Sequence, residues 1–130
     1  MSERKVIVPK GAEVMYESWH FAQAIREGDT LWCSGQLGVG HDGKCPEDPK
    51  AQFQLAFEAV GRVLAEGGAS FADVVEITTF HVGLRQHMGA FAAVKDDFVK
   101  KPYPAWTAIG TTELALPGAL VEIKVIAKLG

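Results

Sequence analysis

The clearest hydrophobic pattern in the chain is the alternation of apolar and polar positions along residues 119–127. Alternate positions of a strand share a face. One face is entirely apolar, and the other combines apolar side chains with two charges. The first face carries Val121, Ile123, Val125 and Ala127, and the second carries Leu120, Glu122, Lys124 and Ile126. The pattern predicts a β-strand with Glu122 in its middle, either as a solvent-facing carboxylate, which is the common case, or as a carboxylate in a cleft.

A helical period of apolar residues marks the middle of the chain. Asp48 and Pro49 form an N-cap followed by proline at the first helical position, and glycines at 67 and 68 end the segment. A second period runs from 86 to 98 and stops before Pro102. The apolar positions are Phe53, Phe57, Val60 and Leu64 in the first segment and Met88, Phe91, Val94 and Phe98 in the second. The sequence therefore predicts two amphipathic helices.

The remaining apolar runs predict strands at 5–8, 21–26, 30–36, 74–82 and 102–110, with 11–18 irregular and 27–29 as a hairpin turn. The run Leu31, Trp32, Cys33 does not alternate, which predicts a central strand covered on both faces. Residues 70–73 resemble a capping box on a single turn. The expected order, β-β-β-α-β-α-β-β, indicates an α+β fold with a single sheet and both helices on one face.

Such a sheet leaves its second face uncovered, with Leu120 and Ile126 on it. A small protein rarely exposes an apolar patch of this kind, so we expect self-association through the bare faces. The 130 residues are expected to form one domain, 1–130.

Composition excludes several classes of protein. Hydrophobic residues make up 48% and charged residues 22%, which argues against disorder, and the net charge of −3 disfavours nucleic-acid binding. We find neither an apolar run of membrane-spanning length nor a signal segment, so we expect no membrane partner and a cytoplasmic location. Cys33 and Cys45 are then expected to be unpaired thiols.

Motifs for metal, nucleotide or nucleophilic chemistry are weak. The run from Gly38 to Gly40 lacks the rest of a nucleotide fingerprint, His41 and Cys45 lack zinc-site partners, and Ser34 is not in a nucleophile elbow. We therefore expect no metal and no cofactor.

An ordered set of short motifs resembles the RidA family, the YjgF-type reactive-intermediate deaminases that are also described as endoribonuclease L-PSP-like. The resemblance spans about residues 15–127. Its main motifs are Gly28-Asp29-Thr30-Leu31, Ser34-Gly35-Gln36, Asp73-Val74-Val75, Thr78-Thr79-Phe80, Pro104-Ala105, Leu116-Pro117 and Val121-Glu122-Ile123.

The resemblance implies a chorismate-mutase-like fold and a homotrimer with a central barrel and three clefts between subunits. Family members of the main group hydrolyse imines and enamines, such as 2-aminoacrylate, without metal or cofactor. By position, Glu122 matches the glutamate thought to place the attacking water. Ser34 and Gly35 match cleft-lining positions, and Phe21 falls where many members have a tyrosine.

The sequence departs from the family pattern at one position, and this departure is expected to change which substrate is bound. Trp106 stands where family members carry the arginine that clamps the substrate carboxylate. Trp106 either fills the cleft by packing or stacks on a ligand, with Glu122 nearby on the next strand. Both readings predict little or no activity on 2-aminoacrylate. The protein is then an imine or enamine hydrolase for another small molecule or, alternatively, a non-catalytic ligand-binding or regulatory homotrimer. The acidic charge weighs against RNA cleavage.

Overall fold

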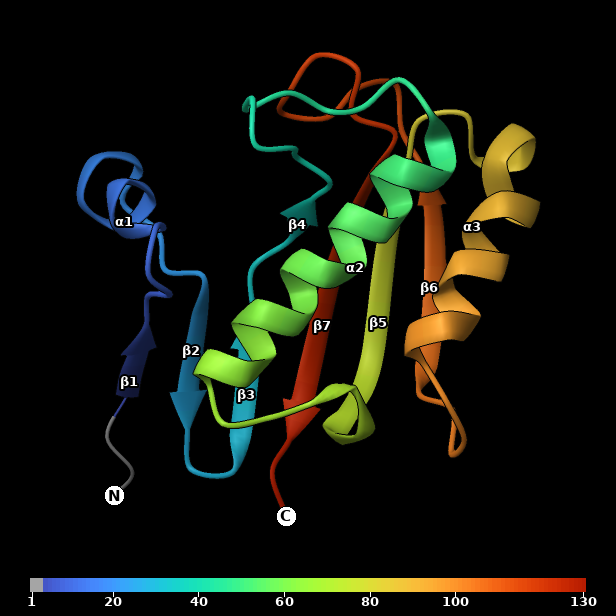
Figure 1. The fold of residues 1–130 in the computed structure, drawn as a ribbon. Coiled ribbons are helices and arrows are strands. Elements are labelled where there is room, and N and C mark those ends of the chain that lie inside the picture. The colour runs from blue at the N-terminus through green and yellow to red at the C-terminus, as the bar shows by residue number, and fades with distance from the viewer. Residues whose placement is uncertain (1–3) are drawn as a thin grey trace.

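The computed structural model describes residues 4–130, and the strands of this part of the chain join in one mixed sheet. The spatial order is β1-β2-β3-β7-β5-β6, and the short β4 also pairs with β7. All pairs are antiparallel except β5 with β6 (Figure 1). The strands are β1 (Arg4–Ile7), β2 (Ala24–Glu27), β3 (Thr30–Cys33), β4 (Gln36–Leu37), β5 (Val74–His81), β6 (Ala105–Gly110) and β7 (Val121–Lys128).

Two long helices, α2 (Pro49–Glu66) and α3 (Leu84–Phe98), cover one face of this sheet, as the sequence predicts (Figure 1). Asp48 caps α2 by accepting a 3.1 Å hydrogen bond from the Ala51 N–H. The predicted capping box forms the 3-10 turn Phe71–Asp73, where the Ser70 N–H donates to Asp73 Oδ2 at 2.9 Å. Within residues 4–130, no helix combines the length and the apolarity needed to cross a membrane.

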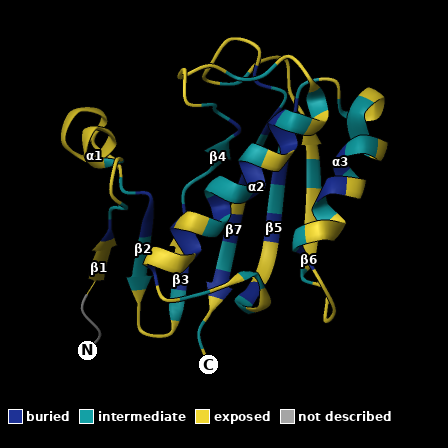
Figure 2. Ribbon diagram, in the orientation of Figure 1, coloured by how far each residue is buried: buried dark blue, intermediate teal, exposed yellow. Residues whose placement is uncertain are grey.

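The core lies between the two helices and the sheet (Figure 2). Burying each of its larger apolar side chains contributes roughly 1.5–3 kcal/mol. Aromatic rings dominate its centre: Phe57 stacks on Phe98 with ring centroids 5.1 Å apart, and Phe91 meets Phe53 edge to face at 5.3 Å. The apolar positions of the β7 alternation, Val121, Ile123, Val125 and Ala127, are all buried here.

In the described residues 4–130, no helix covers the second face of the sheet (Figure 1), and this face exposes large apolar side chains. Trp32 is 51% exposed, and Ile109 of the edge strand β6 is 41% exposed. Within residues 4–130, β3 is therefore covered on one face and not on both as predicted. Leu31 and Cys33 are buried on the helix side, whereas Trp32 points to the open side because no element of residues 4–130 packs over it.

The N-terminal region differs from the sequence prediction. Residues 11–18 were expected to be irregular, yet Glu13–Trp19 forms a short helix, α1, with none of its residues buried. Its N-cap residue, Ala12, has no side chain that could cap the helix, so the usual start signal is missing. The strand β2 begins at Ala24 rather than Phe21, and the expected strand 30–36 is divided into β3 and β4.

Candidate functional site

An irregularity in the strand beside β7 forms the centre of the candidate site. Both β3 and β4 pair with β7, with Trp32 opposite Ile126 and Gln36 opposite Ile123. Trp32 and Gln36 are four residues apart, whereas their partners on β7 are three residues apart. The segment between β3 and β4 therefore contains one extra residue relative to β7. Such bulges bend a strand and redirect side chains, often next to functional sites. Ser34 and Gly35 occupy this bulge.

Gly35 lies directly against the side chain of Glu122. A Cβ atom added to Gly35 would stand 2.6 Å from Glu122 Cδ and 2.7 Å from Cγ, closer than real Cβ contacts. Glycine at this position leaves the space that the Glu122 side chain occupies, and a larger residue would force that side chain to move. Glu122 is half-buried on the open face, and within residues 4–130 it takes part in no salt bridge. Its oxygens remain available to accept hydrogen bonds from water or a ligand.

Ser34 ties the bulge to the segment that precedes β2. Its hydroxyl donates to the Ala22 carbonyl at 2.7 Å, and its N–H donates to the Gln23 carbonyl at 2.8 Å. Phe21, the residue before Ala22, is 42% exposed. The structure therefore brings Ser34, Gly35 and Glu122 together, and Ser34 links them to the chain at Phe21.

Trp106 lies on the other face of the sheet. Its indole Nε1–H donates to Thr79 Oγ1 at 2.9 Å, its ring centroid is 6.0 Å from that of Phe91 on α3, and Lys95 Nζ stands 4.6 Å above it. Moreover, β5 separates β6 from β7, so Trp106 is not on the strand next to Glu122. The run that follows β6 leads to the far side of β5 instead of turning back as a hairpin. Within one chain, Trp106 and Glu122 do not share a cleft.

The Trp106 indole belongs to a buried polar chain. His81 Nε2 lies 2.7 Å from the same Thr79 hydroxyl, and His81 is fully buried, edge-on to Phe91 at 4.8 Å. Burial, and secondly the nearby His87, lowers the pKa of His81, which favours its neutral form. In residues 4–130, His81 Nδ1 has no hydrogen-bond partner.

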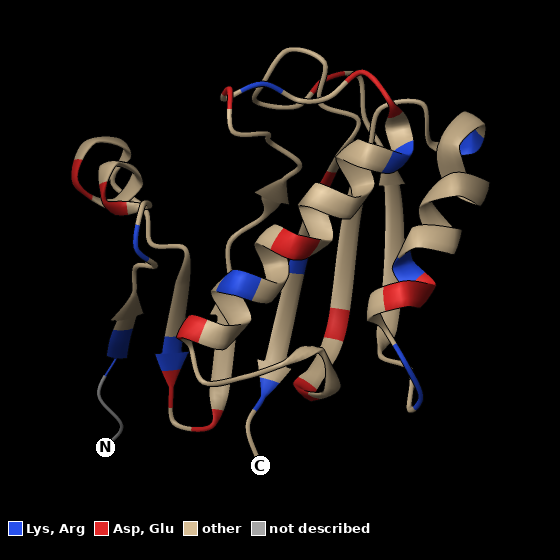
Figure 3. Cartoon of the chain, viewed as in Figure 1, with Lys and Arg blue, Asp and Glu red and all other residues tan. Residues whose placement is uncertain are grey.

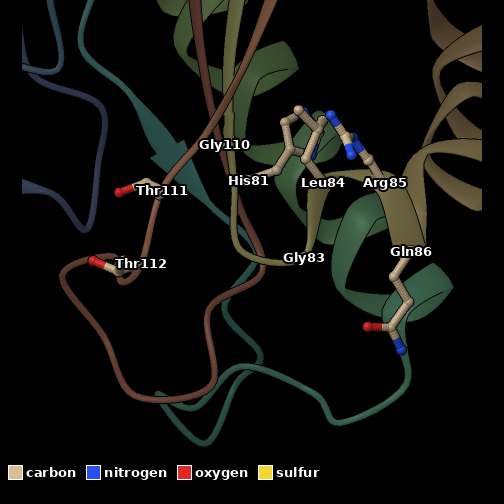
Figure 4. Close-up of a pocket in the computed structure, with 8 residues that line it drawn as sticks. All are labelled: His81, Gly83, Leu84, Arg85, Gln86, Gly110, Thr111 and Thr112. Atoms are coloured by element: carbon tan, nitrogen blue, oxygen red, sulfur yellow. The ribbon is translucent and has the colours of Figure 1, made fainter.

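A pocket of about 600 Å³ opens beside His81, where β5 and β6 end and α3 begins. In Figure 4, His81, Leu84 and Arg85 come from the end of β5 and the first turn of α3, while Gln86 and the two threonines point outward. The lining residues are His81, Gly83, Leu84, Arg85, Gln86, Gly110, Thr111 and Thr112.

Comparison with known proteins identifies the family. The family model described as Endoribonuclease L-PSP matches residues 13–129. The chain is 39% identical to the RutC family protein YjgH of Escherichia coli (strain K12), over 99% of this chain and 98% of that protein. The chain belongs to the YjgF/RidA family.

Three further matches, one to a curated protein and two to solved structures, support this family assignment. The 2-iminobutanoate/2-iminopropanoate deaminase of Dermatophagoides farinae is 31% identical over 82% of this chain and 83% of that protein. The crystal structure of RidA from the Antarctic bacterium Psychrobacter sp. PAMC 21119 superposes with a TM-score of 0.78 at 30% identity, covering 84% of this chain and 88% of the other. The solved structure of protein YjgH gives a TM-score of 0.86 at 39% identity, over 98% and 97% of the two chains. These matches confirm the predicted family and its α+β fold.

Sequence reasoning passed over the pocket beside His81. A signal was present in β5, where Thr79 and His81 occupy the same alternate positions as the buried Ile77. Two polar residues on the helix-covered side of a strand require buried hydrogen-bond partners. They are therefore candidates for a buried hydrogen-bond network. In this YjgF/RidA chain, the network includes the indole of Trp106.

Proposed function

We propose that this protein is a cofactor-free imine or enamine hydrolase that acts as a homotrimer, with Glu122 as its catalytic residue. The observation that carries the proposal is the Glu122 carboxylate, which lies half-buried against Gly35 at the bulge and without an ion pair in residues 4–130. Membership of the family, and the relative named 2-iminobutanoate/2-iminopropanoate deaminase, support the reaction class.

The proposed reaction converts a C=NH group and one water into a C=O group and ammonia. Glu122 accepts a proton from the attacking water while the water oxygen bonds to the imine carbon. The same proton then passes to the nitrogen, which gives a carbinolamine. The hydroxyl proton of the carbinolamine is next transferred to the amino group by way of the same carboxylate, and ammonia leaves as the carbonyl forms. A positioned carboxylate of this kind typically contributes about 10²–10⁴-fold to rate. Gly35 leaves room beside the carboxylate, and Ser34 and Phe21 would complete the substrate-binding surface together with Trp106.

The open face of the sheet supports the homotrimer. Its exposed side chains include Trp32 and Ile109, which a stable soluble protein would be expected to cover. Because Trp106 and Glu122 lie on opposite faces of the sheet, one substrate can meet both only when they come from different protomers. The proposed cleft therefore lies between subunits.

Trp106 supports a substrate other than 2-aminoacrylate. A guanidinium at this position would offer a charged, paired contact to a carboxylate. The indole offers one neutral donor, and that donor is already bonded to Thr79. Losing a hydrogen bond to a charged group of this type costs about 1.5–3 kcal/mol.

The test generates imines in situ with an amino-acid oxidase acting on a panel of amino acids and measures the rate at which 2-oxo acid and ammonia appear. We expect acceleration by the wild type, strongest for imines larger than that formed from 2-aminoacrylate, and loss of acceleration in Glu122→Gln. Glu66→Gln, the same change at an exposed position at the end of α2, is the matched control. Equal rates for wild type and Glu122→Gln would contradict the role of Glu122.

A second candidate is a non-catalytic binding or regulatory trimer, favoured by the packing of Trp106 between Thr79 and α3. It predicts saturable ligand binding with no hydrolysis of any imine. RNA cleavage has less support, because acidic and basic residues are interspersed along the ribbon in Figure 3 and the net charge is −3.

A further inference from the structure

We propose that the pocket at the start of α3 binds the carboxylate of a small organic acid. The recognising groups are the first backbone N–H groups of α3, the ring Nδ1–H of His81 and the guanidinium of Arg85.

The first turn of α3 is suited to an anion. Gly83, its N-cap residue, adopts a left-handed conformation with φ of 75°, and no side chain in residues 4–130 caps the helix. By contrast, Asp48 satisfies the N-terminus of α2. The first N–H groups of a helix lack partners within the helix and carry the positive end of its dipole. In α3 these groups belong to residues that line the pocket, and the first turn contains no acidic residue.

His81 supplies an independent observation. Trp106 Nε1 can only donate, so Thr79 Oγ1 accepts from it. The Thr79 hydroxyl then has its own proton to donate, and we infer that it donates to His81 Nε2, which lies 2.7 Å away. This direction of donation leaves the proton of the neutral imidazole on Nδ1. In this arrangement the Trp106–Thr79–His81 chain makes Nδ1 of His81 the donor.

His81 is one of the residues that line the pocket, and its Nδ1 is a buried atom on the side of the ring away from Thr79. The two ring nitrogens of an imidazole diverge, so Nδ1 points away from Thr79 while Nε2 points at it. His81 closes β5, and only Val82 and Gly83 separate it from α3. Nδ1 has no partner within residues 4–130 although His81 is fully buried, which is rare unless a ligand or water completes the site.

The charge of the lining also fits a carboxylate. Arg85 provides a cation at the exposed mouth, and the described lining residues include no Asp or Glu. The Thr111 N–H donates to the His81 carbonyl at 2.8 Å and thereby holds the loop after β6 against the end of β5. A planar carboxylate can accept from the helix amides and Nδ1–H on one oxygen and from the guanidinium on the other.

The pocket lies on the helix side of the sheet, opposite Glu122 of the same chain. A substrate held here can be reached by Glu122 only from another protomer, so the use of the pocket as a substrate clamp rests on the proposed function. Binding of the carboxylate does not depend on it.

The test uses propionate as the probe and propionamide as its uncharged counterpart. The protein is labelled with ¹⁵N, and ring nitrogens and backbone amides are followed by NMR as each compound is added. Without a probe, we expect His81 to show the Nδ1–H tautomer. Propionate should cause saturable shifts at His81 Nδ1 and at the amides of residues 84–86, and propionamide should not. No saturable shift with propionate, or an Nε2–H tautomer in the free protein, would overturn the proposal.

Three variants sharpen this experiment. Arg85→Gln should weaken propionate binding by about tenfold, the effect of losing one charged hydrogen bond, whereas Arg62→Gln, an exposed arginine on α2, should leave it unchanged. Trp106→Phe removes the indole donor and should let the Nε2–H tautomer of His81 appear. Equal binding by Arg85→Gln and Arg62→Gln, or an unchanged tautomer in Trp106→Phe, would contradict the respective roles.

The two proposals fail separately. Binding of propionate without imine hydrolysis would keep the pocket and reject the enzyme. Imine hydrolysis that is insensitive to propionate, in a protein whose His81 resonances do not respond, would keep the enzyme and reject the pocket.

Discussion

Glu122 and His81 are one register position apart across neighbouring strands, yet they lie on opposite faces of the sheet. Phe80 is opposite Glu122, and His81 is opposite Val121. On the open face, Glu122 stands beside a bulge and large exposed side chains. On the helix face, His81 is buried edge-on against Phe91, and within residues 4–130 its Nδ1 has no hydrogen-bond partner. Because the sheet lies between Glu122 and His81 of one chain, the two residues can contact the same small molecule only if they come from different protomers.

The largest expected effect is the loss of imine hydrolysis in Glu122→Gln, by about 10² or more. Because the proposed site combines Glu122 of one protomer with the pocket of another, Glu122→Gln and Arg85→Gln should complement each other. Subunits of the two variants, mixed by unfolding and refolding together, should regain about a quarter of the wild-type sites in a symmetric trimer.

The measurement is the rate of ammonia release by the mixture compared with the two variants refolded separately. Rates that equal the mean of the two variants would mean that Glu122 and the pocket do not meet between subunits. Mixing each variant with itself provides the control for losses during refolding.

The next effect concerns the open face. Trp32→Glu places a charge where the proposed trimer is packed, and burying an unpaired carboxylate is strongly unfavourable. We expect the variant to sediment as a monomer at micromolar concentration while the wild type sediments as a trimer. Lys50→Glu, on the exposed side of α2, should leave the assembly unchanged. A trimer for Trp32→Glu would show that this part of the face is not an interface.

Gly35→Ala tests the close approach at the bulge. Its new Cβ would overlap the Glu122 side chain, and overpacking of this kind typically costs about 1–3 kcal/mol of unfolding free energy. The cost should fall in the double variant with Glu122→Ala, because the overlapping atoms are removed. Gly89→Ala is the control, since a Cβ there meets nothing within 4 Å and lies on a helix. Urea denaturation of the wild type, Gly35→Ala, Glu122→Ala and the double variant gives the coupling energy, and a coupling near zero would contradict the contact.

Much of the fold follows from local sequence signals. The apolar period from Phe53 to Leu64, the cap at Asp48 and the alternation of β7 specify their elements because pattern and packing agree. The helix α1 could not be predicted, because it has neither a capping side chain nor a buried stripe. The exposure of Trp32 could not be predicted, because an apolar run looks the same in the sequence whether or not an element of its own chain covers its second face.

The candidate site was less accessible to sequence reasoning. Glu122, Ser34 and Gly35 could be selected from the sequence. The family resemblance indicates all three positions, and the alternation of β7 indicates that Glu122 lies on the face opposite the buried residues. The position of Trp106 relative to Glu122 depends on strand order, which is not encoded in the succession of strands: β5, formed earlier in the chain, is inserted between β6 and β7. The donor at His81 depends on three side chains from two strands, and only the structure brings these into one hydrogen-bonded chain.

The smallest expected effect is a pH dependence of stability that comes from the helix face. Burial, with a further contribution from His87, lowers the pKa of His81 in the folded protein. The unfolded chain returns His81 to its ordinary pKa, near 6.5. As pH falls below that value, the unfolded state binds a proton that the folded state resists, so the free energy of unfolding decreases until the pH passes the lower folded pKa. Urea denaturation of the wild type should therefore show falling stability between about pH 7 and about pH 5.

His81→Phe keeps a ring against Phe91 but cannot titrate, and its stability should fall less over the same interval. His41→Gln, in an exposed loop, should follow the wild type. Parallel curves for the wild type and His81→Phe would mean that His81 is not held neutral by its surroundings. Propionate would sharpen the result, because a bound carboxylate next to Nδ1 favours the protonated ring and should reduce the loss of stability at low pH.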